Sequence, residues 1–130
     1  MRPLFDHQVT ELNRRYIDVY ALDDPGVGSG NHHYQINAVK EASNDTEVND
    51  IAETVELKFQ NGALKEVGVN GITDQALLAV VLDRLRSFQS GHFACRANAI
   101  AITKIEECLE AMKLRAEQRA KRGVEGTHQK

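Results

Sequence analysis

The residues best suited to binding chemistry surround a turn expected within FQSGHFACRANA, residues 88–99. Phe88 and Phe93 flank this turn and offer aromatic rings on which a planar base can stack. Arg96 and Asn98 follow directly, with a cation and an amide that can hydrogen-bond a polar ligand. Apolar residues would be expected at these positions of a helical hairpin. Either these side chains line a ligand pocket, or Asn98 only hydrogen-bonds the turn backbone.

A second group of residues with binding chemistry lies near the end of the chain. Residues 111–130 contain six Lys and Arg against two Glu, a formal charge of +4, so the chain total of −3 leaves −7 on the first 110 residues. Arg115, Arg119 and Arg122 follow i, i+4, i+7 spacing, so they share one helix face and can converge on phosphate. Alternatively, they only offset the dipole at a helix C-terminus, with Arg115 a simple surface residue. An acidic body with a basic end indicates a local anion site rather than a protein that coats DNA.

The terminal stretch GVEGTHQK, residues 123–130, also contains groups that can bind phosphate. Backbone N–H groups around Gly126 and the hydroxyl of Thr127, followed by His128, can wrap an anion. A frayed terminus is the alternative interpretation.

Catalytic and metal-binding chemistry is not indicated elsewhere in the sequence. The glycine-rich stretch at 25–31 lacks the GK[ST] ending of a phosphate loop and precedes a predicted strand. Cys95 and Cys108, if on one helix, are about 20 Å apart, too far for a disulfide, and are expected to be reduced thiols. Adjacent His32 and His33 would point to opposite faces of a strand. We therefore expect no catalytic residue, no metal and no cofactor.

The elements before residue 72 indicate a small sheet. Residues 4–15 have the apolar spacing of a short amphipathic helix, and residues 16–22 and 32–39 are predicted strands. Residues 41–53 contain five acids and no base, which is typical of a solvated loop. In residues 54–71, Val55, Leu57 and Phe59 alternate with polar residues, QNGA supplies a turn, and apolar residues resume with Leu64, Val67 and Val69, which predicts a β-hairpin. Together these segments predict an antiparallel sheet of about four strands.

From Ile72 the apolar period changes to that of helices. Thr73 is a predicted N-cap for a helix over 74–89, which Gly91 ends. A second helix is predicted from about 93 to 122, ending at Gly123. The predicted apolar stripes are Leu78, Val81, Leu85 and Phe88 on the first helix, and Asn98, Ile102, Ile105, Leu109, Met112 and Arg115 on the second.

The lengths of these two helices predict an oligomer. At 1.5 Å per residue the second helix is roughly 20 Å longer than the first, so part of its apolar stripe must be covered by the sheet or by another copy of the chain. Asn98 and Arg115 are about 25 Å apart on one straight helix. One chain can hardly bring both residues to one small ligand, whereas two antiparallel copies of the long helix could.

These elements predict an α+β fold, a small antiparallel sheet followed by a long C-terminal antiparallel helical hairpin. Residues 1–71 form the expected N-terminal domain of a short helix and sheet, and residues 72–130 the hairpin domain with its basic tail. The start of the chain is unlike a signal peptide, and no apolar run approaches about 18 residues, so we expect an intracellular protein without a membrane partner.

The sequence resembles a known family. Residues 70–112 and 119–130 look like the helical hairpin domain shared by phage anti-CBASS and anti-Thoeris sponge proteins, and residues 18–36 and 55–73 look like the small sheet of the anti-Thoeris branch. FACRANA, NGITD and RGVEGTHQ are the most specific motifs. The turn departs from the family pattern, since His92 and Ala97 stand where related sequences have Pro and Glu, a change that would alter pocket polarity.

The resemblance implies a non-enzymatic protein, cytoplasmic in the infected or lysogenic host, that sequesters cyclic nucleotide immune signals intact. Its implied ligands are glyco-cyclic ADP-ribose isomers, with cyclic di- and trinucleotides in separate pockets, and its implied assembly is a homohexamer. By motif position Phe88 stacks on the base, Asn98 hydrogen-bonds it, Arg115 of another subunit reaches the phosphates, and the tail around Gly126–His128 contributes to the second pocket. The alternatives are an enzyme that degrades the same signals and a nucleic-acid-binding adaptor with a basic tail.

Overall fold

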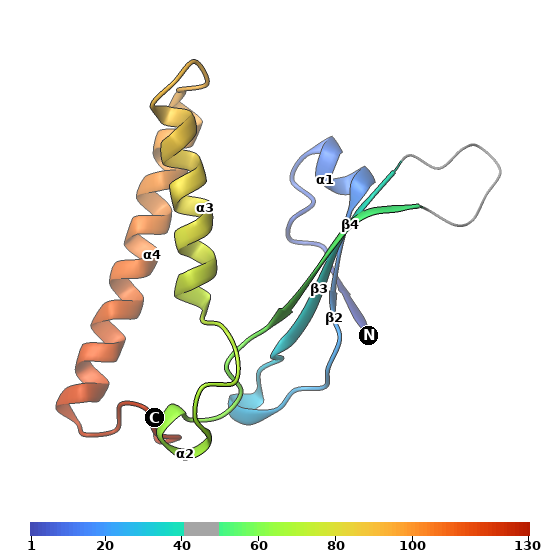
Figure 1. Ribbon diagram of the computed structural model, residues 1–130. Coiled ribbons are helices and arrows are strands. Elements are labelled where there is room, and N and C mark those ends of the chain that lie inside the picture. The colour runs from blue at the N-terminus through green and yellow to red at the C-terminus, as the bar shows by residue number, and fades with distance from the viewer. Residues whose placement is uncertain (41–49) are drawn as a thin grey trace. The chain divides into compact units, whose positions relative to one another are not determined.

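The computed structural model describes residues 1–40 and 50–130 and contains two compact units, Met1–Asn61 and Gly62–Lys130. The first unit is a four-stranded antiparallel sheet with a short helix, and the second is helical (Figure 1). The predicted α+β class, with the sheet before the helical hairpin, is confirmed. The units divide at Asn61, earlier than the predicted change at residue 72, because residues 62–71 join the helical unit.

The sheet has the strand order β1-β2-β3-β4, with every neighbouring pair antiparallel. Its strands are β1 (Arg2–Leu4), β2 (Ile17–Ala21), β3 (His33–Val39) and β4 (Ile51–Lys58). The register places Val19 opposite Ile36, and Ile36 opposite Val55, so three β-branched residues cross the sheet in one row. The strands predicted at 16–22 and 32–39 are confirmed as β2 and β3.

The helix predicted over 4–15 is shorter than expected. Leu4 belongs to β1, and only α1 (Glu11–Tyr16) is helical. Thr10 caps this helix, since its side chain accepts a hydrogen bond from the backbone N–H of Asn13 at 3.2 Å. Apolar spacing alone favoured a longer helix, whereas pairing with β2 and the cap at Thr10 decide the observed boundaries.

The loop between β2 and β3 is held by Asp23. Its carboxylate accepts backbone N–H groups of His32 at 2.9 Å and of His33 at 3.2 Å, and the Asn31 amide at 3.4 Å. These hydrogen bonds, foremost that from His32, lower the pKa of Asp23. The glycine-rich part of the loop contains a 3₁₀ turn, η1 (Val27–Ser29), and continues into β3. It is a structural connection that precedes a strand, as predicted.

The prediction of a β-hairpin at 54–71 is wrong. Its first half is the end of β4, but its second half forms the short helix α2 (Leu64–Val67), which Gly68 ends at φ +75°. Residues 41–49 of the predicted acidic loop lie outside the described residues, and Ile51–Glu53 belongs to β4. Leu64 and Val67 are three residues apart, which fits a helical turn, whereas Val67 and Val69 are two apart, which fits a strand, so this short pattern did not distinguish them.

The helical hairpin consists of α3 (Asp74–Gln89) and α4 (Arg96–Lys121) (Figure 1). Thr73 caps α3 as predicted, since its hydroxyl accepts the N–H of Ala76 at 3.1 Å. Gly123, at φ +72°, follows the end of α4. The second helix begins three residues later than expected because Cys95 is its N-cap. None of the helices within residues 1–40 and 50–130 is long and apolar enough to cross a membrane.

Packing between α3 and α4 differs in part from the predicted stripes. On α3, Leu82 is the most buried side chain at 6% exposure, whereas Val81 and Phe88 of the predicted stripe are exposed. Apolar residues surround the middle of α3, so periodicity did not identify the packed face. On α4 the predicted stripe from Asn98 to Met112 is half-buried, as expected for the face toward α3, and Arg115 is exposed.

Candidate functional site

The turn between α3 and α4 is held closed by Gln89. Its side-chain Nε2 donates to the carbonyl of Cys95 at 2.9 Å, and its Oε1 accepts the N–H of Cys95 at 2.9 Å. This two-point bond joins the last residue of α3 to the N-cap of α4. These two hydrogen bonds restrain the turn and limit the conformations that its residues can adopt.

Two predicted pocket rings meet at this turn. The centroids of Phe88 and Phe93 are 6.3 Å apart, at 77° to one another, an edge-to-face pair. Phe88 remains 37% exposed and Phe93 76%. The guanidinium carbon of Arg84 lies 4.9 Å from the centroid of the Phe88 ring. The structure thus presents a supported but accessible aromatic ring, the arrangement that base stacking requires.

Arg96 and Asn98 stand at the start of α4, directly after this turn. The Asn98 amide nitrogen donates to the carbonyl of Phe93 at 3.2 Å, and its backbone N–H meets the sulfur of Cys95 at 3.4 Å. The expectation that Asn98 bonds the turn backbone is therefore met, and this bond also orients its amide oxygen. Arg96 is exposed, and its side chain has no hydrogen-bond or ion-pair partner within residues 1–40 and 50–130.

Replacing Gln89 with alanine is expected to loosen this turn and to lower the free energy of unfolding by about 1–2 kcal/mol, since two partly exposed hydrogen bonds are lost. Faster amide hydrogen exchange at Cys95 and a lower melting temperature would measure the effect. Gln118→Ala, at an exposed position of α4, is the control and should change neither. Unchanged exchange at Cys95 in the Gln89→Ala variant would contradict the assigned role.

Arg115 is not near the turn within one chain. Asn98 and Arg115 lie on the same uninterrupted helix α4, and 17 residues of α-helix span about 25 Å. Arg115 and Arg122 are exposed and, in the described part of the chain, their side chains have no acceptor. The structure therefore brings Phe88, Phe93, Arg96 and Asn98 together and leaves Arg115 at a distance.

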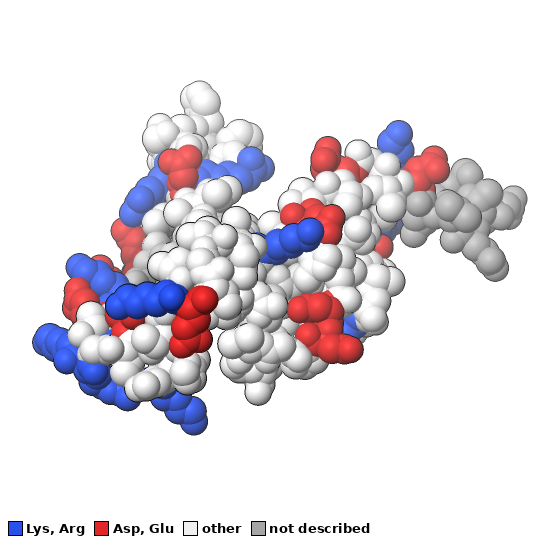
Figure 2. All heavy atoms as spheres, turned by 60° about the horizontal axis from the view of Figure 1, so that its bottom comes forward, with Lys and Arg blue, Asp and Glu red and all other residues white. Residues whose placement is uncertain are grey.

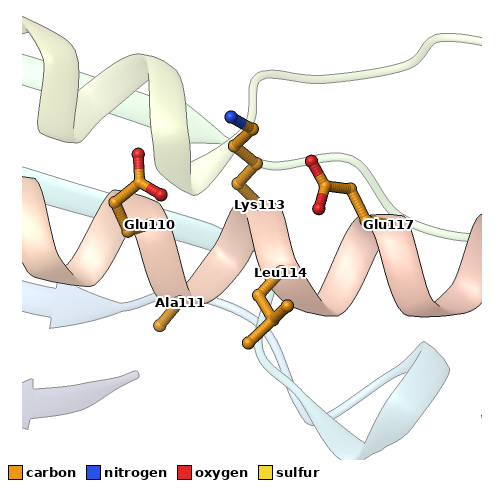
Figure 3. A pocket seen from close by; sticks show the side chains of 5 residues that line it. All are labelled: Glu110, Ala111, Lys113, Leu114 and Glu117. Carbon is orange, nitrogen blue, oxygen red and sulfur yellow. The ribbon is translucent and has the colours of Figure 1, made fainter.

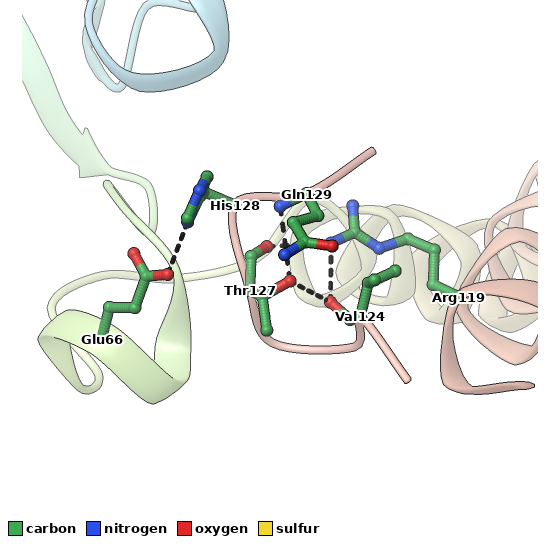
Figure 4. Close-up of polar contacts among 6 residues, drawn as sticks. All are labelled: Glu66, Arg119, Val124, Thr127, His128 and Gln129. Carbon is green, nitrogen blue, oxygen red and sulfur yellow. Dashed lines mark hydrogen bonds and ion pairs between the residues drawn. The ribbon is translucent and has the colours of Figure 1, made fainter. Parts of the chain in front are cut away.

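Arg119 binds the C-terminal tail of its own chain. Its Nη2 donates to the carbonyls of Val124 at 3.0 Å and Thr127 at 2.9 Å (Figure 4). The Thr127 hydroxyl also donates to the Val124 carbonyl at 2.6 Å, and Val124 is only 7% exposed. The tail is thus folded, and the Arg119 guanidinium is partly engaged within the protein.

The end of the tail is also attached to α2. His128 Nδ1 lies 2.6 Å from a carboxylate oxygen of Glu66, and the N–H of Lys65 donates to the carbonyl of Gly126 at 3.0 Å (Figure 4). Gly126 has φ +76°, and a Cβ there would lie 3.0 Å from Lys65 Cγ. The left-handed backbone favours glycine at residue 126, and the short distance to the Lys65 side chain adds to this preference. Gly126, Thr127 and His128 are therefore part of a folded tail, in which the Thr127 and His128 side chains contact other residues of the same chain.

Basic side chains gather where α4 ends, as Figure 2 shows for the face it presents. This part of the sequence contains Lys113, Arg115, Arg119, Lys121 and Arg122. A nearby open depression on α4, of about 290 Å³, is lined by Glu110, Ala111, Lys113, Leu114 and Glu117 (Figure 3). With two carboxylates and one ammonium group, its formal charge is negative. This depression does not suit an anionic ligand, so the accessible arginines remain the better phosphate-binding groups.

The thiols and imidazoles form no metal centre in the part of the chain that the structure describes. Cys95 and Cys108 are both free, in agreement with the expectation of reduced thiols. His33 pairs with Glu56 across the sheet, and His32 contacts the carbonyl of Val27 at 2.9 Å. Each of these histidines has a structural partner.

Sequence inspection missed three residues that shape these sites: Arg84, Gln89 and Glu66. Arg84 lies four residues before Phe88 on α3, a spacing from which a contact could have been predicted. Gln89 contacts Cys95 across the turn, and Glu66 contacts His128, which is 62 residues further along the chain. No local pattern indicated either contact.

Comparison with known proteins locates the similarity in the hairpin. The family described as "Acb2/Tad1, hairpin domain" matches residues 51–117, just over half of the chain, from β4 through most of α4. A protein of Bacillus phage SBSphiJ7, "Thoeris anti-defense 1", is 49% identical over 74 residues, which cover 57% of this chain and 52% of that protein. The chain therefore spans about half the length of this curated relative.

Proposed function

The chain belongs to the Acb2/Tad1 hairpin-domain family of phage anti-Thoeris proteins, and from this premise we propose that it sequesters nucleotide immune signals of the bacterial host intact. The primary ligands are glyco-cyclic ADP-ribose isomers, and the site of action is the cytoplasm of the infected or lysogenic cell. The observation that supports this best is the closed turn that presents an accessible Phe88 ring beside the Asn98 amide.

The chemistry of this turn fits a nucleotide with a diphosphate. Stacking of a base on Phe88 contributes about 1–3 kcal/mol, and each charge-assisted bond from an arginine to a phosphate oxygen about 1.5–3 kcal/mol. Nanomolar affinity corresponds to about −12 kcal/mol and needs a pocket formed in advance. The Gln89 bonds and the edge-to-face ring pair support such preorganisation.

A complete pocket in this proposal needs a second copy of the chain. Arg115 supplies the phosphate contact, and it is about 25 Å from Asn98 along α4. The hairpin also exposes large apolar side chains, among them Val80 at 65%, Ile100 and Leu114. Apolar surface of this kind is typical of an association face. We propose at least a dimer, with the hexamer of the family as the full assembly and the tail around Thr127 serving a second pocket for cyclic di- and trinucleotides.

Mass spectrometry of released ligand tests sequestration. The purified protein is mixed with extract from cells whose TIR sensor has been triggered, freed of unbound small molecules, and heated. Sequestration predicts that an intact glyco-cyclic ADP-ribose species is released and is depleted from the extract. A linear ADP-ribose product would instead show an enzyme that degrades the signal.

The second alternative is a nucleic-acid-binding adaptor that uses the basic end of α4. It predicts binding to duplex DNA with steep salt dependence, whereas a sponge should ignore duplex DNA. Release of no nucleotide from the heated protein, together with duplex binding, would replace the proposed function with this one.

A further inference from the structure

Arg84 is the one arginine of α3 whose charge is not paired in the described part of the chain. The other, Arg86, donates to Glu106 of α4 at 3.0 Å and so joins the two helices. Within residues 1–40 and 50–130 the Arg84 side chain has no hydrogen-bond or ion-pair partner, and its guanidinium carbon lies 4.9 Å from the centroid of the Phe88 ring. Its guanidinium N–H donors are therefore available to an external acceptor.

The position of Arg84 relative to Phe88 is well defined. The two residues are four apart on one helix, where side chains lie one above the other, and Phe93 meets Phe88 edge-to-face. A cation over the ring and a second ring beside it limit the orientations of Phe88. A ligand that stacks on the remaining exposed part of this ring places its charged groups close to a planar cation.

We propose that Arg84 is a further ligand-binding residue of the Phe88 pocket: its guanidinium orients the ring and donates to the phosphates of the stacked nucleotide. This inference rests on the proposed function, because it assigns a further contact to the same ligand. The role of Arg84 differs from that proposed for Arg115, since Arg84 comes from the same chain and the same helix as Phe88. One chain thus provides both a stacking surface and a cation, and the partner copy adds a second cation.

Titration of the oligomeric protein with a glyco-cyclic ADP-ribose isomer at two salt concentrations tests this inference. Arg84→Gln is expected to weaken binding about 10- to 50-fold, because a cation–π contact and a charge-assisted bond are lost. It should also flatten the salt dependence, which loss of ring orientation alone would not change. Arg84→Lys keeps the charge but not the planar group, and should retain the salt dependence with intermediate affinity.

The matched control is Arg86→Gln, which removes the same charge from the same helix two residues away. It should bind within about twofold of wild type, given the distance dependence of screened charges. Equal affinity of wild type and Arg84→Gln would overturn the inference and leave the proposed function intact. Equal losses in Arg84→Gln and Arg86→Gln would overturn it as well, since only net charge would then matter. No binding by the wild-type protein would overturn the proposed function, and this inference with it.

Discussion

Phe88→Ala is expected to weaken binding of a glyco-cyclic ADP-ribose isomer by about 5- to 150-fold, the range given by the loss of one base–aromatic stacking contact. The ring is accessible and contacts Arg84 and Phe93, so its removal deletes the stacking surface of the proposed pocket. Isothermal titration calorimetry of the wild-type and variant proteins would measure the change. Phe88→Tyr should keep most of the affinity because it keeps the ring.

Controls for Phe88→Ala separate stacking from folding. Phe88 is 37% exposed and is not part of the Leu82 core, so helical circular dichroism should be nearly unchanged. Phe5→Ala removes an exposed ring from the sheet unit and should leave affinity at the wild-type value. Wild-type affinity in Phe88→Ala would show that the ligand does not stack on this ring.

The helical hairpin was predictable from sequence because its signals are local. Thr73 followed by apolar residues at helical spacing determined the start of α3, and Gly123 the end of α4. Cys95 as the N-cap of α4 was not expected, since sulfur is a weak acceptor. The start of α4 was therefore placed too early.

The segment before the hairpin was not predictable in the same way. Leu64 and Val67 are three residues apart, as in a helix, and Val67 and Val69 are two apart, as in a strand. Residues 64–67 form one helical turn, α2, held by tail contacts from Gly126 and His128. These partners are about 60 residues away in sequence. Local pattern alone could not choose between a strand and a turn whose stability comes from such distant contacts.

The part of the candidate site that lies at the turn between α3 and α4 was predictable, because its residues are close in sequence. Phe88, Phe93, Arg96 and Asn98 are close in sequence and remain close in the structure. The tail was open to two interpretations, and the bonds from Arg119 to its carbonyls show how it is held. Those bonds could not be predicted because a flexible arginine at i, i+5 or i, i+8 has many alternative partners.

The separation of Phe88 from Arg115 leads to the second large prediction. Arg115→Ala alone should weaken binding about 10- to 150-fold through loss of a charge-assisted phosphate contact. Phe88→Ala should do the same through loss of stacking. Each variant carries the residue that the other lacks, and both substitutions are at exposed positions, so both variants are expected to fold and assemble.

Mixing the two variants should therefore restore binding. In an isologous interface, random assembly of equal amounts gives about one quarter of the pockets an intact Phe88 from one copy and an intact Arg115 from the other. Titration of the co-refolded mixture should then show a class of tight sites with wild-type affinity, about one quarter as numerous as in the wild-type protein. Each variant refolded alone is the control and should show no tight sites.

Absence of tight sites in the mixture would mean that Phe88 and Arg115 do not act in one pocket built from two chains. That result would not depend on the oligomer number, because the expected fraction follows only from the pairing of two copies at each pocket. Recovery would establish that α4 meets an antiparallel copy of itself with the turn of one chain near the basic end of the other. The greater length of α4 would then have a direct function, since its extra turns, roughly 15 Å beyond the length of α3, would bring Arg115 to the ligand of the neighbouring chain.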